Sequence, residues 1–145
     1  MQHVSKTLIG IVKDSSEKFR KMGLSEWEFR KAPGKWSKKE ILGHMIDSAA
    51  NNHQRFVRAQ YGDKTPISYN GDAWVKAQDY NSQDVKMLIE LWTNYNLHLA
   101  HVISKIPADK YGVRFIADAK EPATLEWIVN DYLKHLEHHL GQLSS

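Results

Sequence analysis

Four long amphipathic helical segments constrain the fold of this chain more than any other feature. In each segment apolar side chains recur at intervals of three and four residues, which is the spacing of one helix face. The segments cover residues 4–22, 41–56, 85–103 and 125–143. A helix with one apolar face is unstable alone in water, so the four must bury these faces against one another. We therefore predict an all-α fold, a four-helix bundle.

Capping residues indicate where three of these helices begin. Ser37 and Glu40 form a capping box, in which the hydroxyl and the carboxylate each bind a free backbone amide of the first turn. Asn81 or Ser82 is a candidate cap for the third helix, and Thr124 is a candidate cap for the fourth.

The connections between the helices are long and contain all four prolines. They cover residues 23–36, 61–80 and 107–123. The middle connection, of about 20 residues, is longer than most loops and rich in aromatic side chains, so we expect a lid or a pocket wall. In the third we expect a short turn or hairpin around residues 111–116. Without an internal repeat or a second core, residues 1–145 are predicted to form a single domain.

Composition and motifs exclude several classes of function. The chain has no cysteine, which rules out disulfides, thiolate metal ligands and a cysteine nucleophile. The net charge of +3 comes from scattered residues, so we expect no nucleic-acid partner. No apolar stretch approaches the roughly 20 residues of a membrane span, and no signal peptide is evident. We therefore expect no membrane association and a cytoplasmic location. Phosphate-binding loops, dinucleotide fingerprints and zinc-protease motifs are also absent.

Histidines are the remaining candidates for chemistry. His135 and His139 stand one turn apart on the same face of the last helix. On a helical wheel His139 falls inside the apolar stripe and His135 at its edge, whereas His138 faces outward. Each inward imidazole needs a partner for its ring nitrogens, and a shared metal ion would be such a partner.

A third ligand has to come from another helix, and His44 lies just beside the apolar face of the second helix. A polar flank continues from His44 along that helix, as the wall of a pocket would. It consists of Ser48, Asn51 and Arg55, and Asn52 is expected nearer the core. His98 and His101 map away from the apolar stripe of the third helix, so we expect both to face solvent. From the residues alone, a His44–His135–His139 metal site and a bundle with simply packed histidines remain alternatives.

Two stretches resemble the DinB/YfiT-like metalloenzyme family. Trp36-Ser37 … Glu40-Ile41-Leu42-Gly43-His44, followed by Asn51-Asn52 … Arg55-Phe56, is similar to its second helix. Thr124-Leu125-Glu126-Trp127 … Asp131-Tyr132 … His135-Leu136-Glu137-His138-His139-Leu140-Gly141-Gln142 is similar to its last helix. The similarity spans roughly residues 4–143, which is nearly the whole chain.

The resemblance implies a bundle of up-down-down-up topology and a homodimer. It also implies a divalent metal ion, zinc or nickel, held by His44, His135 and His139. Because His138 and His139 are adjacent, the motif leaves open which of them binds, and the helical wheel favours His139.

The resemblance further implies a function, because the family includes thiol-dependent transferases and isomerases in which the metal activates a low-molecular-weight thiol. We therefore expect a metal-dependent enzyme, a thiol S-transferase, whose thiol arrives as a cosubstrate. One alternative is a metal-dependent hydrolase, for which no carboxylate is clearly placed, since Asp47 and Glu137 are both expected to face outward. Another is a non-catalytic bundle that binds a ligand or a partner.

The candidate substrate-binding residues are Ser48, Asn52, Arg55 and Trp74. Arg55 could hold a carboxylate of the thiol or of its partner substrate. The alternative for Arg55 is a salt bridge to an acidic side chain, either Asp47, Asp72 or Glu137. Trp74 and Tyr69 could close the pocket, although ordinary packing is the favoured role for Trp74. No residue is assigned as catalytic.

Overall fold

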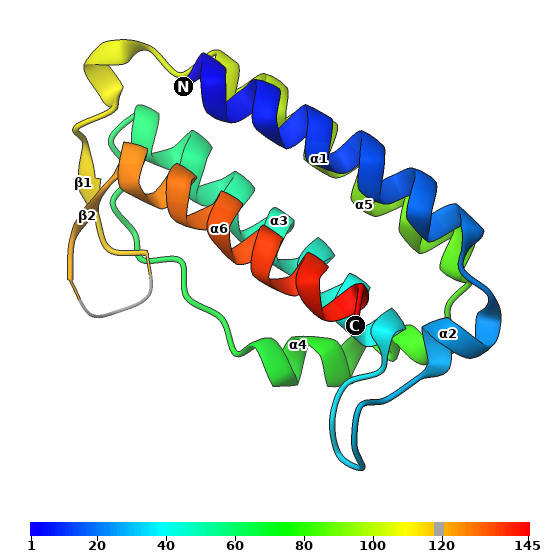
Figure 1. The fold of residues 1–145 in the computed structure, drawn as a ribbon. Coiled ribbons are helices and arrows are strands. Elements are labelled where there is room, and N and C mark those ends of the chain that lie inside the picture. The colour runs from blue at the N-terminus through cyan, green and yellow to red at the C-terminus, as the bar shows by residue number, and fades with distance from the viewer. Residues whose placement is uncertain (118–120) are drawn as a thin grey trace.

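The computed structural model describes residues 1–117 and 121–145 and consists mainly of four long helices packed side by side (Figure 1). These are α1 (Gln2–Lys21), α3 (Lys38–Gln60), α5 (Val85–Ser104) and α6 (Leu125–Leu143). The connections contain the short helices α2 (Leu24–Glu28) and α4 (Gly71–Gln78) and the 3-10 turns η1 (Tyr80–Ser82) and η2 (Ala108–Lys110). Strand β1 (Arg114–Phe115) pairs antiparallel with β2 (Ala123–Thr124) just before α6. The predicted all-α four-helix bundle is confirmed.

The long helices have the up-down-down-up topology. The start of α1 lies beside the end of α5, where Gln2 Nε2 donates to the Ser104 carbonyl at 2.8 Å. The start of α3 likewise lies beside the end of α6, where Lys38 Nζ donates to the Leu143 carbonyl at 2.9 Å. Helices α3 and α5 run in the same direction (Figure 1). A parallel pair requires a connection that returns along the bundle, which explains the length of the middle connection.

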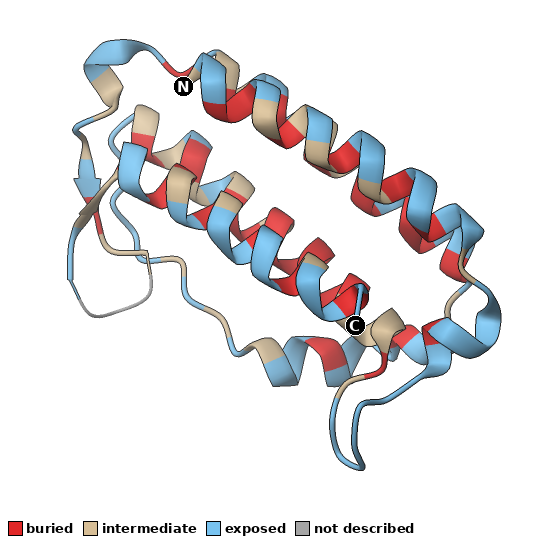
Figure 2. Ribbon diagram, viewed as in Figure 1, coloured by how far each residue is buried: buried red, intermediate tan, exposed pale blue. Residues whose placement is uncertain are grey.

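The core lies between the four long helices and uses the predicted apolar faces. Buried residues follow the inward side of each helix (Figure 2). At one end of the bundle, Trp27 from α2 and Trp92 from α5 pack against Phe19, with ring centroids 5.4 and 5.1 Å away. Burying side chains of this size contributes about 1.5–3 kcal/mol each, so α2 helps to close that end of the core.

Two of the predicted caps are present. The Ser37 hydroxyl accepts from the Glu40 amide at 3.1 Å, and Glu40 accepts from the Ser37 amide at 2.9 Å. Thr124 caps α6 through the backbone amide of Trp127 at 3.1 Å. The prediction for α5 is wrong, because its cap is Asp84 rather than Asn81 or Ser82. Those two residues lie in η1, where the chain makes an extra turn before the helix begins.

The middle connection forms a wall against α3. The ring of Tyr80 packs on Gly43, where a Cβ would lie only 2.1 Å from the ring. The Tyr80 hydroxyl donates to Asp47 Oδ1 at 2.5 Å, and Gln78 Nε2 donates to the same oxygen at 2.8 Å. Asp47 is therefore buried, and the expectation that it faces outward is wrong. Glu137 is exposed, as expected.

The third connection contains the predicted turn, but its hairpin is larger than expected. Residues 114–115 pair with residues 123–124 rather than within 111–116. The part of this connection at 118–120 lies outside the described residues. No helix among the described residues is long and apolar enough to span a membrane.

Candidate metal centre

Three imidazoles from α3 and α6 converge at one end of the bundle. His44, His135 and His139 each offer a ring nitrogen, and these atoms all lie within 4.8 Å of one another. The Nε2 atoms of His135 and His139 are 3.0 Å apart, and the His44 ring centroid lies 4.6 Å from that of His139. The convergence follows from the topology, since antiparallel packing places the early turns of α3 beside the late turns of α6. No other group of three or more such ligands occurs in the described part of the chain.

Gln142 orients His139. The Nδ1 atom of His139 lies 2.8 Å from Gln142 Oε1, and an amide oxygen can only accept a hydrogen bond. His139 Nδ1 therefore carries the proton, which leaves the Nε2 lone pair directed toward His135. Gln142 was not among the predicted site residues. Its position three residues after His139, on the same helix face, is the sequence signal that identifies it.

His44 is held between an aromatic ring and the start of α4. The Trp36 ring centroid lies 4.7 Å from that of His44, and a Cβ on Gly71 would lie 3.3 Å from His44 Cε1. His44 Nδ1 is buried without a hydrogen-bond partner among the described residues. An unsatisfied buried polar atom costs about 1–3 kcal/mol. The cluster therefore has hydrogen-bonding or metal-binding capacity that the protein itself does not satisfy.

The pKa values of all three imidazoles lie below the ordinary value, although His135 is exposed whereas His44 and His139 are buried. Burial lowers the pKa of His44 to about 4, and the neighbouring His139 and His135 add to the effect. Burial also lowers the pKa of His139 and of His135, although the charge of Asp131 partly opposes the shift at His135. Neutral imidazoles present free lone pairs at neutral pH. Three such donors suit a divalent metal ion, and the residues present fit one.

The cluster opens into a cavity of about 410 Å³ between α3, α6 and the middle connection. Its lining is mainly polar: besides the histidines it includes Trp36, Ser48, Asn52, Arg55, Tyr69 and Asp131. Three of the four predicted substrate-binding residues therefore line the cavity, namely Ser48, Asn52 and Arg55. Trp74 lies outside the lining and packs against Tyr69, with ring centroids 5.6 Å apart.

Arg55 joins three segments around this cavity. Its Nε donates to the Ile67 carbonyl at 3.0 Å, and its Nη2 donates to the Ala117 carbonyl at 3.2 Å. Its Nη1 donates to Asn52 Oδ1 at 3.3 Å. The described hydrogen bonds of Arg55 thus go to backbone carbonyls and an amide rather than to the acidic residues considered from the sequence. Arg55 holds the middle connection and the segment after β1 against α3.

Asp131 is a lining residue that the sequence prediction missed. It lies on α6 one turn before His135, and its charge raises the pKa of His135 against the effect of burial. From the sequence, Asp47 and Glu137 were the carboxylates considered near the site. The spacing of four residues from His135 is the signal that points to Asp131 instead.

Comparisons with known proteins agree with this fold. The model of the DinB superfamily matches residues 13–143. YfiT of Bacillus subtilis (strain 168), provisionally named a metal-dependent hydrolase, is 24% identical over 114 residues. That alignment covers 77% of this chain and 64% of the relative, so the chain spans less than two thirds of its length.

Two solved structures share the architecture. The YfiT structure, described as a probable metal-dependent hydrolase with an unusual four-helix bundle topology, superposes with a TM-score of 0.80 at 22% identity. That match covers 97% of this chain and 83% of YfiT. A mycothiol-dependent maleylpyruvate isomerase superposes with a TM-score of 0.81 at 12% identity, over 100% of this chain and 61% of the isomerase. At these identities the likenesses show the fold, and the family match shows that this chain belongs to the DinB superfamily.

Proposed function

We propose that this protein is a divalent-metal-dependent enzyme that transfers a low-molecular-weight thiol to an electrophilic small molecule. The observation that carries the proposal is the convergence of His44, His135 and His139 at a polar cavity. The relative named as a metal-dependent hydrolase supports the metal, and the fold neighbour named as a mycothiol-dependent isomerase supports the thiol. Zinc and nickel both suit three neutral imidazoles.

The three histidines would hold the ion, with His139 oriented by Gln142. When bound, the ion would supply a Lewis acid with a position open to substrate and would lower the pKa of a thiol or water there. The chain contains no cysteine, so the thiol has to arrive as a cosubstrate. Transfer would then form a bond between the thiol sulfur and the electrophilic carbon, and the leaving group would depart with the electron pair of the broken bond.

The other lining residues would bind and orient the substrate. Burial raises the pKa of Tyr69 and the nearby Ser48 hydroxyl partly opposes this shift, and the two side chains present a polar surface beside the histidines. Trp36 covers one face of His44 and limits the access of water to that ring. Arg55 keeps the wall that carries Tyr69 in place through the Ile67 carbonyl.

The test is thiol transfer by zinc-loaded and nickel-loaded protein, with chlorodinitrobenzene as the electrophile and cysteine, glutathione and mercaptoethanol as thiols. We expect metal-dependent acceleration with at least one thiol, lost in His135→Ala and His139→Ala and retained in His98→Ala. The proposal is wrong if the metal-loaded protein accelerates no transfer and leaves the pKa of each thiol unchanged.

Metal-dependent hydrolysis is the second candidate, and the position of Asp131 favours it. A carboxylate in the cavity lining can accept a proton from an attacking water molecule. Hydrolysis of ester, amide or phosphate substrates without added thiol, lost in Asp131→Asn, would support this function over thiol transfer. If the metal-loaded protein hydrolyses none of these substrates, hydrolysis is excluded as its function.

We also propose a single-domain protein that forms a homodimer in the cytoplasm. The dimer is supported by large apolar side chains that remain exposed on one chain, among them Leu24, Phe29, Met87 and Leu91. Light scattering coupled to gel filtration should give twice the 16.7 kDa mass of one chain.

A further inference from the structure

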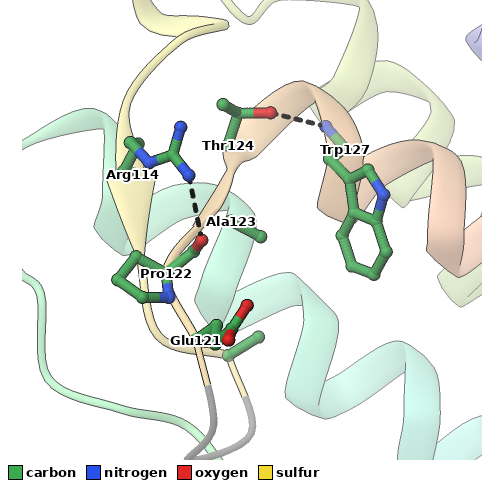
Figure 3. Close-up of a pocket in the computed structure, with 7 residues that line it drawn as sticks. Arg114, Glu121, Pro122, Ala123, Thr124 and Trp127 are labelled. Atoms are coloured by element: carbon green, nitrogen blue, oxygen red, sulfur yellow. Dashed lines mark hydrogen bonds between the residues drawn. The ribbon is translucent and has the colours of Figure 1, made fainter.

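A second cavity, of about 640 Å³ (Figure 3), shares no described lining residue with the cavity at the histidine cluster. Its lining comes from the described residues of the β1–β2 hairpin and from the start of α6: Arg114, Ala117, Glu121, Pro122, Ala123, Thr124 and Trp127. The two cavities adjoin at one hydrogen bond. Arg55 lines the first cavity, Ala117 lines the second, and Arg55 Nη2 lies 3.2 Å from the Ala117 carbonyl.

Both cavities follow one ridge of α6. His139, His135, Asp131 and Trp127 are spaced four residues apart, and side chains at this spacing follow one another along a helix surface. The first three line the first cavity and Trp127 lines the second. Since a helix rises 1.5 Å per residue, His139 and Trp127 are separated by about 18 Å along the axis. The linings of the two cavities therefore extend over about this length of α6, from the histidine cluster to the hairpin.

The second cavity differs chemically from the first. Its largest side chain is Trp127, which is 58% exposed, and the lining also includes apolar Pro122 and Ala123. The Arg114 guanidinium, on β1, donates to the Pro122 carbonyl at 3.3 Å and lies on the opposite side of β2 from Trp127 (Figure 3). An exposed indole next to apolar side chains is a platform for a planar apolar group.

We propose that the second cavity is a distal subsite for an elongated ligand with a planar, apolar end. The reacting group lies at the histidine cluster, a hydrogen-bonding middle section lies along Ser48 and Tyr69, and the planar end packs on Trp127. This inference rests on the proposed function, because that function places the reacting group at the histidines. It narrows the substrate class to molecules that extend well beyond a compact thiol.

A series of phenylalkyl hydroxamates of increasing linker length, with acetohydroxamate as the short reference, tests the inference on zinc-loaded protein. The hydroxamate binds the metal end, so affinity should rise at least tenfold once the extended linker approaches about 18 Å. Trp127→Ala should remove that gain and leave acetohydroxamate binding unchanged. Phe29→Ala, which alters an exposed aromatic side chain outside both cavities, should bind the whole series like the unmodified protein. Binding of acetohydroxamate without a length-dependent gain would overturn the subsite.

If no hydroxamate binds, the result contradicts the metal site of the proposed function and does not address the distal subsite. A second measurement on metal-free protein then tests the subsite. Naphthalene sulfonate is added to metal-free protein, and the indole N–H signals are followed by NMR, with Trp127→Phe identifying the signal of Trp127. We expect the Trp127 signal to shift and the Trp74 signal to remain in place. An unmoved Trp127 signal would contradict the distal subsite whatever the histidines bind.

Discussion

At the scale of single residues, Gln142 is the side chain outside the cluster that we expect to affect metal binding most. Its hydrogen bond fixes the tautomer of His139. Replacing it in Gln142→Leu leaves the imidazole free to rotate and to place its proton on Nε2, so metal affinity should fall about 10–100-fold. Isothermal titration with zinc measures the change. Gln142 is exposed, so the variant should fold normally.

His138→Ala is the matched control for Gln142→Leu. His138 is exposed, and its ring centroid lies 5.2 Å from that of His139. Zinc affinity should remain unchanged in this variant, which also tests whether His139 rather than its neighbour is the ligand. Wild-type affinity in Gln142→Leu, or a loss of affinity in His138→Ala, would contradict the assignment.

His53 links folding stability to pH away from the metal centre. Its Nδ1 lies 2.9 Å from the Tyr95 hydroxyl, and burial together with the nearby His98 lowers its pKa. As pH falls, His53 therefore becomes protonated near pH 6.5 in the unfolded chain but only at a lower pH in the folded chain. Below that pH this histidine lowers the free energy of unfolding progressively until pH falls through the folded pKa.

His53→Gln should remove this dependence. Relative to the unmodified protein, its free energy of unfolding should improve as pH falls from 7 to 5, as measured by urea denaturation of metal-free protein. His101→Gln, which removes an exposed histidine from the same bundle, corrects for the general effect of losing a histidine. A parallel pH dependence for the two variants would show that His53 is not the group involved.

The sequence indicated the converging histidines, with His139 buried and His135 exposed at the edge of the apolar stripe, but not their surroundings. His135 and His139 could be predicted because helix periodicity alone gives their direction. Asp47 could not, because its burial depends on the Tyr80 ring and the Gln78 amide, which reach it from a connection without a periodic pattern. Asp131 was missed because its role depends on the cavity that the folded connection creates.

At the scale of elements, the contact between η1 and α3 depends on Gly43. The Tyr80 ring occupies the space that a side chain at this position would need. Gly43→Ala should therefore displace Tyr80, weaken its hydrogen bond to Asp47 and lower the free energy of unfolding by about 1–3 kcal/mol. Urea denaturation measures this loss.

Gly10→Ala provides the opposite control. Gly10 lies within α1, and a Cβ added there would meet no neighbouring atom within 4 Å in the described part of the chain. Alanine at this position should therefore add about 1 kcal/mol through helix propensity. Opposite signs for the two substitutions are the expected result. A Gly43→Ala protein as stable as the parent would show that Tyr80 does not depend on this close approach.

The long helices were predictable as elements and the short ones were not. Helix α6 begins at the predicted cap Thr124 and ends at Leu143, because both its cap and its apolar stripe are visible in the sequence. Helix α4 has only eight residues, too few for a clear amphipathic pattern, and is stabilised by packing on α3. The turn η1 is also too short to show a pattern in the sequence. The cap of α5 was therefore predicted at Asn81 or Ser82 rather than at Asp84.

At the scale of the whole molecule, the topology creates the candidate metal centre. Antiparallel packing of α3 and α6 places His44 beside His139, and the parallel α3–α5 pair forces the chain to return along the bundle through the middle connection. That connection supplies Tyr69 and Gly71 to the cavity. A bundle with short loops would bring neither to the histidines.

The most direct test of a three-histidine metal centre is the metal content of untagged protein, measured by elemental mass spectrometry after reconstitution with zinc or nickel. The account predicts one ion per chain in the unmodified protein and a loss of binding in His44→Ala, His135→Ala and His139→Ala. It predicts full content in His98→Ala and His101→Ala, with circular dichroism showing that every variant is folded. Protein that holds no metal after reconstitution, or that keeps its metal when any of the three histidines is replaced, would contradict it.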